Sequence, residues 1–83
     1  MMFTVYVLYS AKHDKIYIGY TSNLKQRLIS HNELGTKGYT LKYRPWEVVF
    51  TEQFQTKTEA IRREKALKTA AGRAFIWNKI NGA

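Results

Sequence analysis

The sequence contains no cysteine and only one proline among its 83 residues. Without cysteine the chain can form neither a disulfide nor a thiolate metal site, so we expect a protein of a reducing compartment, the cytoplasm. No apolar run approaches membrane-spanning length, and the short apolar start lacks the basic leader of a signal peptide. We therefore expect residues 1–83 to form a single domain with no membrane partner.

Acidic residues are also scarce. Six Asp and Glu stand against fourteen Lys and Arg, which gives a net charge of +8 at neutral pH. This excess favours a polyanionic partner, with nucleic acid as the first candidate; the alternative is a charge that only aids solubility or binds an acidic protein. So few carboxylates argue against a two-metal site, and the sequence has no P-loop, nucleophile elbow or zinc-spaced cluster of His and Cys.

Two segments near the start of the chain are rich in β-branched and aromatic residues. Residues 3–10 and 15–20 are predicted to be strands, joined by four turn-compatible residues as an antiparallel hairpin. In that register Tyr6 lies opposite Gly19. Because side chains alternate along a strand with a period of two, Tyr6, Tyr17 and Gly19 then share one face of the sheet. A turn one residue longer or shorter would separate them.

The middle of the chain is predicted to hold a helix, a loop and a strand. Ser22 or Asn23 is a good N-cap for a first helix, which closes before Gly35. Residues 33–45 contain two glycines and the only proline, which is typical of a solvent-facing loop. Residues 46–54 are the third predicted strand.

The last third of the chain is predicted to be helical. Residues 56–59, Thr-Lys-Thr-Glu, form a capping box that opens a second helix. We expect Gly72 to interrupt it, and residues 73–80 to form a short closing helix. The predicted fold class is therefore α/β of the α+β type, a three-stranded antiparallel sheet flanked by about three helices in the order β-β-α-β-α-α.

Glu64 lies on the apolar stripe of the second predicted helix. At about 100° per residue it is in phase with Ala60, Leu67 and Ala71. An unpaired buried charge is costly, so this carboxylate should have a partner. Two interpretations stay open: a salt bridge to a neighbouring Arg or Lys, the commoner outcome for a lone Glu, or a metal ligand in a cleft.

Arg27 and His31 lie four residues apart and share one face of the first predicted helix. Arginine could bind a phosphate through its planar fork, and histidine could accept or relay a proton. The alternatives are a solvated arginine at the rim of the core and a hydrogen-bonded histidine near the helix end. The paired tyrosines could likewise be packing residues, although Gly19 beside them would leave room for a ligand to approach the backbone.

These residues follow a distinctive order along the chain. A Tyr in the first strand precedes Tyr17-Ile18-Gly19 in the second, Arg27 in the next helix and Glu64 in a later one. This order resembles the GIY-YIG nuclease superfamily, and the runs 17–32 and 60–73 look like its small stand-alone branch. The resemblance covers nearly the whole chain. The family also includes the nuclease module of the bacterial excision-repair C subunit, which links the resemblance to DNA repair.

The resemblance implies hydrolysis of a phosphodiester by water with one divalent ion, Mg²⁺ or Mn²⁺. The tyrosine matching Tyr6 is the favoured base, with Tyr17 close by and His31 as an assistant. The arginine matching Arg27 stabilises negative charge on the phosphate, and the glutamate matching Glu64 holds the metal. Because a phenol with a pKa of about 10 is a poor base at neutral pH, the metal, Arg27 and nearby lysines would have to lower the pKa of Tyr6.

The sequence departs from the family pattern at two places. The first motif reads Val-Tyr-Val over residues 5–7, so only the tyrosine and the β character match. Many family nucleases also carry an asparagine on the last helix. The corresponding position here is Ile76, with Asn78 and Asn81 nearby but out of phase.

The favoured function is a DNA endonuclease with little intrinsic sequence specificity. Nothing in the sequence looks like a base-reading helix, so backbone contacts should dominate, and DNA structure or a partner protein would supply specificity. The candidate phosphate contacts are Lys25, Arg44, Lys65, Lys68 and Arg73. The alternative is a non-catalytic module that binds DNA or RNA, and a pure protein-interaction module leaves the site residues unexplained. We expect a monomer or a weak dimer.

Overall fold

In a computed structural model of the chain, residues 2–30, 32 and 42–82 are described. They include six elements in the order β-β-α-β-α-α, which confirms the predicted fold class. The elements are β1 (Phe3–Ser10), β2 (Lys15–Thr21), α1 (Leu24–Ile29), β3 (Glu47–Phe54), α3 (Lys57–Leu67) and α4 (Ala70–Ile80). Within this part of the chain, no helix has the length and apolar character needed to cross a membrane.

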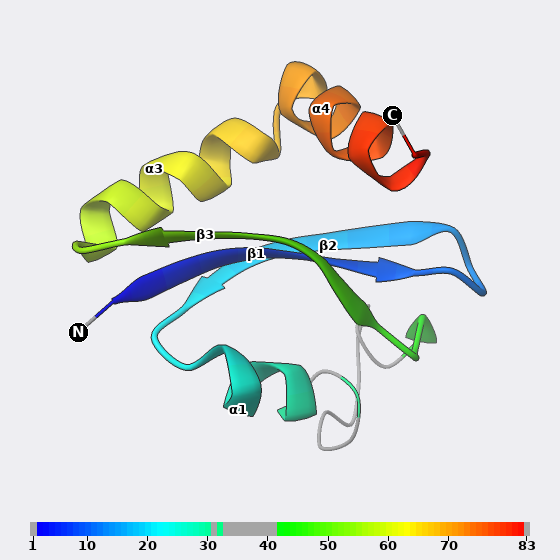
Figure 1. The fold of residues 1–83 in the computed structure, drawn as a ribbon, viewed down its shortest axis with the longest axis horizontal. Helices are drawn as coiled ribbons and strands as arrows, with labels where there is room; N and C mark the ends of the chain where they lie inside the picture. The colour runs from blue at the N-terminus through cyan, green and yellow to red at the C-terminus, as the bar shows by residue number, and fades with distance from the viewer. Residues whose placement is uncertain (1, 31, 33–41, 83) are drawn as a thin grey trace.

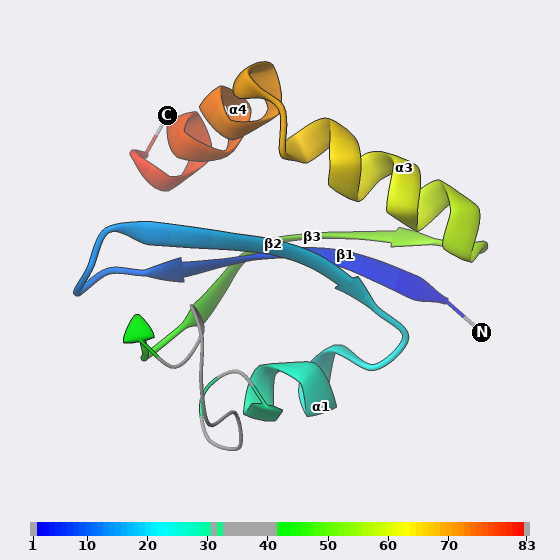
Figure 2. The same ribbon diagram turned by 180° about the vertical axis from the view of Figure 1, so that it is seen from behind.

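The sheet is antiparallel with the strand order β2-β1-β3, so β2 and β3 are its edges. Helices α3 and α4 cover one face, and α1 lies against the other (Figure 1). The same division is seen from behind (Figure 2). Strands β1 and β2 pair with Tyr6 opposite Gly19 and Leu8 opposite Tyr17, which confirms the register predicted from the turn length.

The two faces of the sheet have different side chains. The face under α3 and α4, here called the aliphatic face, is built from Val5, Val7, Ile16 and Ile18 together with Ala60, Leu67 and Ile76 of the helices. The face beside α1, here called the tyrosine face, is built from Tyr6, Leu8 and Trp46 with Tyr17, Leu24, Leu28, Tyr43 and Val48 packed against them. The alternation of side chains along β1 and β2 produces this separation.

Helix α1 begins where the sequence predicts, because Asn23 is its N-cap and accepts a hydrogen bond from the Gln26 amide at 3.1 Å. Its last residue is Ile29. The third strand starts at Glu47, one residue later than predicted. Trp46 instead exchanges two hydrogen bonds with the Asn32 side chain, at 2.7 and 3.0 Å, which ties the end of the α1 region to the start of β3.

Thr56 is the N-cap of α3, as predicted, and the Glu59 side chain accepts a hydrogen bond from the Thr56 hydroxyl, not from its backbone amide. The Thr56 hydroxyl accepts a hydrogen bond from the Glu59 amide at 3.2 Å and donates one to the Glu59 carboxylate at 2.9 Å. The helix continues to Leu67 and not to Gly72. The prediction of an interruption at Gly72 is therefore wrong.

The break lies at Thr69, which is the N-cap of α4 and accepts a hydrogen bond from the Gly72 amide at 3.2 Å. Gly72 lies inside the first turn of α4. A Cβ atom there would approach Leu67 Cα to 2.5 Å, so only glycine lets α4 pack this closely against the end of α3. Ala71, predicted on the stripe of Glu64, belongs to α4 instead and is exposed.

Candidate active site

A cleft of about 260 Å³ lies at the β2 edge of the sheet. Its lining comes from β1, β2, α1 and α3 and consists of Tyr6, Tyr17, Gly19, Tyr20, Thr21, Arg27 and Glu64. The structure therefore brings five of the residues singled out in the sequence to one place. Three consecutive elements, β1, β2 and α1, must fold together with the distant α3 before this cleft exists.

Gly19 allows the two phenols to lie at the edge of the sheet. A Cβ atom at position 19 would lie 2.7 Å from Tyr6 Oη and 3.1 Å from Tyr17 Cε1. The rings of Tyr6 and Tyr17 are stacked with centroids 6.3 Å apart. The space beside Gly19, expected to admit a ligand, is filled by the Tyr6 phenol, so the glycine serves the packing of the site.

Arg27 lines the cleft together with the two phenols. It is held in α1 by a hydrogen bond from its amide to the Asn23 carbonyl at 3.1 Å. Its guanidinium interacts with the hydroxyls of both Tyr6 and Tyr17, and the interaction with Tyr6 raises the pKa of Arg27 above its ordinary value. The arginine is exposed, so its fork is fully charged and accessible to an anion in the cleft.

The Tyr6 phenol is fully buried, with 0% of the residue exposed. Burial raises the pKa of Tyr6 above its ordinary value, and the interaction with Arg27 only partly offsets this. The expectation that Arg27 and its neighbours lower this pKa is therefore wrong for the protein without bound metal, because desolvation outweighs the interaction with Arg27. At neutral pH Tyr6 is a protonated phenol.

Glu64 reaches the cleft from α3, and its side chain is 16% exposed. Lys68, one helical turn later, lies 3.5 Å from the carboxylate and is half exposed. This is the expected cationic partner, but the distance is longer than the roughly 2.7–2.9 Å of a strong ion-pair hydrogen bond. The ion pair therefore does not prevent the carboxylate from binding a ligand in the cleft.

A hard divalent cation suits this carboxylate. Across residues 2–30, 32 and 42–82, no group of three or more His, Cys, Asp or Glu side chains gathers into a metal site. A cation bound here would thus have Glu64 as its carboxylate ligand, with water and phosphate oxygens as the others. That donor set fits magnesium or manganese, which retain several waters in such sites.

Thr21 was not singled out in the sequence, yet it positions the site. Its hydroxyl accepts a hydrogen bond from the Asn23 amide at 3.0 Å and lies 3.3 Å from the Asn23 carbonyl. These contacts fix the turn from β2 into α1, and with it the direction of Arg27. The spacing Thr-x-Asn before a helix is the sequence signal for such a turn.

The remaining predicted residues are less closely grouped. His31 lies outside the described residues. Lys25 and Lys65 are exposed, while Arg44 is half-buried and its guanidinium donates to the Ser30 carbonyl at 3.5 Å. Lys68 and Arg73 line a second cleft on the other side of β2.

The last helix supplies no asparagine to the cleft lining. Ile76 is buried in the aliphatic face with 1% exposed. Asn78 is exposed, and Asn81 is the C-cap of α4. Ile76, the residue expected to match the family asparagine, is thus a core residue here.

Comparison with known proteins shows the family of the chain. The family model for the GIY-YIG catalytic domain matches residues 2–81. A UPF0213 protein of Staphylococcus haemolyticus is 40% identical over 65 residues, 78% of each chain. One from Bacillus pumilus is 42% identical over 64 residues, 77% of this chain and 64% of that one. The solution NMR structure of a UPF0213 protein from Bacillus halodurans superposes with a TM-score of 0.57 at 27% identity, covering 99% of this chain and 88% of that one.

Proposed function

The chain belongs to the GIY-YIG catalytic domain family, and on that premise we propose that it is a metal-dependent endonuclease that hydrolyses DNA with little intrinsic sequence specificity. One observation carries the proposal: an arginine, a carboxylate and two phenols converge on one cleft of a domain with a charge of +8. A nuclease needs a cation for the phosphate, a ligand for a metal and an acceptor for the proton of water.

Arg27 is the group proposed to bind the reacting phosphate. As water attacks phosphorus, negative charge grows on the non-bridging oxygens, and a fixed guanidinium stabilises that charge more than it stabilises the ground state. The interaction of Arg27 with the two phenols favours one position of the guanidinium before substrate arrives. Less reorganisation is then needed during the reaction.

Glu64 is the residue proposed to hold the divalent ion. A metal bound to this carboxylate supplies Lewis acidity to the phosphate and stabilises the leaving oxygen. In its absence Lys68 is the nearest cation, at 3.5 Å. We therefore expect metal and Lys68 to compete for Glu64.

Of the two phenols, Tyr17 is the one proposed to take the proton of the attacking water. Tyr6 has no exposed surface and a raised pKa, whereas Tyr17 is half-buried and lines the cleft. Tyr17 and Arg27 also line the same cleft, so a water bound there lies near both. Tyr6 then acts by holding Arg27 and by stacking on Tyr17.

The alternative is a basic module that binds nucleic acid without cleaving it. One observation favours it: Ile76 is packed in the core where many family nucleases have an asparagine. This alternative and the nuclease both predict binding that depends on salt, because both rest on contacts between cations and phosphates. They differ in whether a phosphodiester is broken.

The experiment incubates the purified protein with supercoiled plasmid and with nicked or branched DNA, in Mg²⁺, in Mn²⁺ and in chelator. We expect metal-dependent nicking that disappears in both Glu64→Ala and Arg27→Ala. Absence of cleavage on every substrate, with DNA binding unchanged in the two variants, would leave only the non-catalytic alternative. RNA of matched sequence, run in parallel, tests the preference for DNA.

A further inference from the structure

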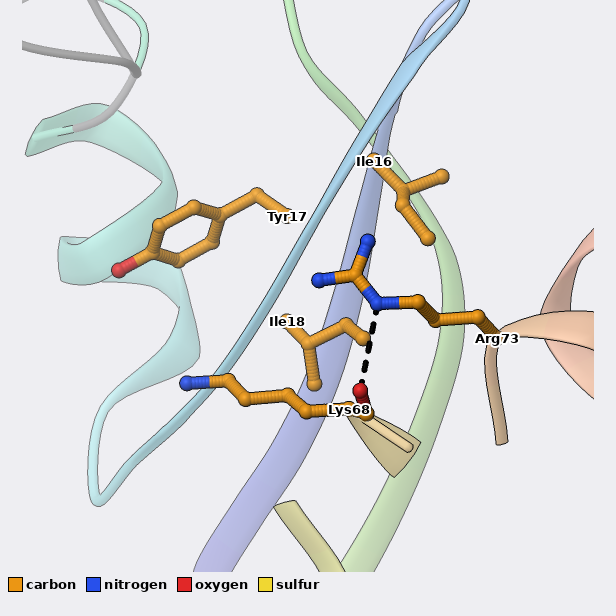
Figure 3. Close-up of a pocket in the computed structure, with 5 residues that line it drawn as sticks. All are labelled: Ile16, Tyr17, Ile18, Lys68 and Arg73. Carbon is orange, nitrogen blue, oxygen red and sulfur yellow. Dashed lines mark hydrogen bonds between the residues drawn. The ribbon is translucent and has the colours of Figure 1, made fainter. Parts of the chain in front are cut away.

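A second cleft, of about 380 Å³, lies against the same edge strand as the candidate active site. It is lined by Ile16, Tyr17, Ile18, Lys68 and Arg73. In Figure 3 the side chain of Tyr17 points toward α1, whereas Ile16 and Ile18 point toward Lys68 and Arg73. Because Tyr17 belongs to the lining of both clefts, only strand β2 separates the two. We call this second cleft the α4 groove.

The α4 groove carries two cations on an apolar floor. Arg73 Nε donates a hydrogen bond to the Lys68 carbonyl at 3.3 Å (Figure 3), which holds the guanidinium at the turn between α3 and α4. None of the described lining residues is acidic. Ile16 and Ile18, which are 8% and 6% exposed, form the floor. A fixed arginine fork and a neighbouring ammonium favour a phosphate group, and the apolar floor suits the sugar carbons beside it.

The cations also follow the candidate active site in order along the chain. Lys68 lies one helical turn after Glu64 and contacts it at 3.5 Å, and Arg73 follows in the first turn of α4. The path from Arg27 and Glu64 to Lys68 and Arg73 therefore runs along β2 from the Gly19 end toward the Ile16 end. A strand with its reacting phosphate at Glu64 would bring the next phosphate toward Lys68 and Arg73.

We propose that the α4 groove binds the phosphate adjacent to the one that is cleaved, so that the substrate is a nucleic-acid strand that continues past the reacting bond along β2. The inference rests on the proposed function, since it assigns a neighbour to the reacting phosphate. It also predicts that the protein reads the strand on one side of the cleaved bond.

The experiment uses the full chain and a single-stranded oligonucleotide whose products are resolved by length. At one cleaved bond, the adjacent phosphodiester on either side is replaced by a neutral methylphosphonate. On one side this replacement should lower wild-type cleavage at that bond about tenfold, the loss of one charge-assisted contact. On the unmodified strand, Arg73→Gln should cleave more slowly than wild type by a similar factor. In this variant the methylphosphonate should lower the cleavage rate little further.

Lys79→Gln is the matched control. Lys79 lies on the same helix, but its ammonium is over the rings of Phe50 and Phe75, 5.6 and 5.0 Å from their centroids, on the side of β3. Lys79→Gln removes the same charge as Arg73→Gln, and this variant should cleave as wild type does. Two results would overturn the proposal. One is equal cleavage by Arg73→Gln and Lys79→Gln, and the other is a neutral linkage that lowers cleavage by Arg73→Gln as much as it lowers cleavage by wild type.

Binding separates this inference from the proposed function. If the wild-type protein cleaves nothing, the proposed function fails, but oligonucleotide affinity over a range of salt still tests the groove. Arg73→Gln should reduce the slope of log affinity against log salt by about 0.7, the value for one phosphate contact on a single strand. Lys79→Gln should leave the slope unchanged. Identical slopes in all three proteins would contradict phosphate binding in the α4 groove.

Discussion

On the aliphatic face of β1 and β2, Val and Ile side chains pack under α3 and α4, whereas on the tyrosine face of the same strands aromatic rings with hydroxyl tips gather beside α1. Aliphatic burial is non-directional and contributes about 1.5–3 kcal/mol for each large side chain. A buried hydroxyl is costly without a polar partner, and Arg27 interacts with the hydroxyl of Tyr6. The candidate active site lies where the faces meet, because Glu64 approaches from α3 and Arg27 from α1.

This difference predicts that changes on the two faces have separable effects. Substitutions at the cleft should reduce cleavage more than stability, and substitutions under α3 and α4 should do the reverse. A protein in which both kinds of change reduced cleavage equally would contradict the division.

The largest effect on cleavage is expected for Glu64→Gln. Loss of the carboxylate removes a metal contribution of several kcal/mol, so the rate should fall about 10³-fold or more. Stability should change little, since the partner Lys68 is half exposed and lies 3.5 Å from the carboxylate. Glu59→Gln is the matched control, because it removes the same charge from the same helix and glutamine still serves a capping box. Similar rates for the two variants would contradict the role of Glu64.

Tyr17→Phe is expected to have the next largest effect. A general base contributes about 10²–10⁴-fold, so removal of this hydroxyl should lower single-turnover cleavage by at least the smaller factor. Tyr6→Phe should lose at most about tenfold, the worth of one hydrogen bond. Both variants keep the aromatic rings, so melting temperatures should confirm that they fold. A greater loss in Tyr6→Phe would return the role of base to Tyr6.

Gly19→Ala tests whether the phenols must lie where they do. The added methyl group would meet Tyr6 Oη at 2.7 Å, so the phenol has to move. A displacement of about 1 Å at a catalytic site can cost up to about 10²-fold in rate. Cleavage and the absorbance of the tyrosines should both change. Full activity in this variant would show that the position of Tyr6 does not matter.

Ile76→Ala tests the aliphatic face. Truncation of a buried isoleucine should lower the free energy of unfolding by about 2–5 kcal/mol, measured by urea denaturation. Cleavage per folded molecule should remain within about twofold, because the removed atoms lie on the far side of the sheet from Tyr17. Ile76→Val, with an expected cost of about 0.5–1.5 kcal/mol, serves if the alanine variant does not fold. If the variant is fully folded and yet cleaves much more slowly than wild type, the separation of the two faces is contradicted.

The smallest effect concerns alkaline stability. Burial raises the pKa of Tyr6 in the folded protein, so the unfolded chain releases this proton first, near pH 10. The contribution of Tyr6 to the free energy of unfolding is complete below about pH 10 and is lost as the pH rises through the pKa of Tyr6 in the folded protein. Urea denaturation at about pH 9 and pH 11 should show a smaller loss in Tyr6→Phe than in wild type. Tyr9, whose pKa is raised mainly by its hydrogen bond to Asp14, leaves part of the dependence in place. Identical losses would contradict the burial of Tyr6.

Much of the fold followed from local signals. A four-residue turn and the period of two were enough to place Tyr6 opposite Gly19, and the capping box was enough to start α3. The end of α3 was misplaced because Gly72 looks like a stop signal in sequence. Its real constraint is the close approach of α4 to Leu67, which only the packed helices show.

The sequence predicted which residues form the candidate site better than it predicted their pKa shifts. The order of residues along the chain brought Tyr6, Tyr17, Arg27 and Glu64 forward, and the structure places them on one cleft. The direction of the Tyr6 pKa could not be predicted, since it depends on how completely its neighbours cover the ring. The α4 groove was equally hidden, because it depends on where Arg73 lies after the turn.

The most direct test of the account is a titration of the labelled protein with Mn²⁺, followed by the NMR signals of its backbone amides. Paramagnetic broadening should appear first at Gly19, Tyr20, Thr21 and Glu64, which line the cleft, and should be absent there in Glu64→Gln. Broadening that begins instead around Asp14 or Glu47, with the cleft signals still sharp, would contradict the claim that this cleft is the metal-dependent active site.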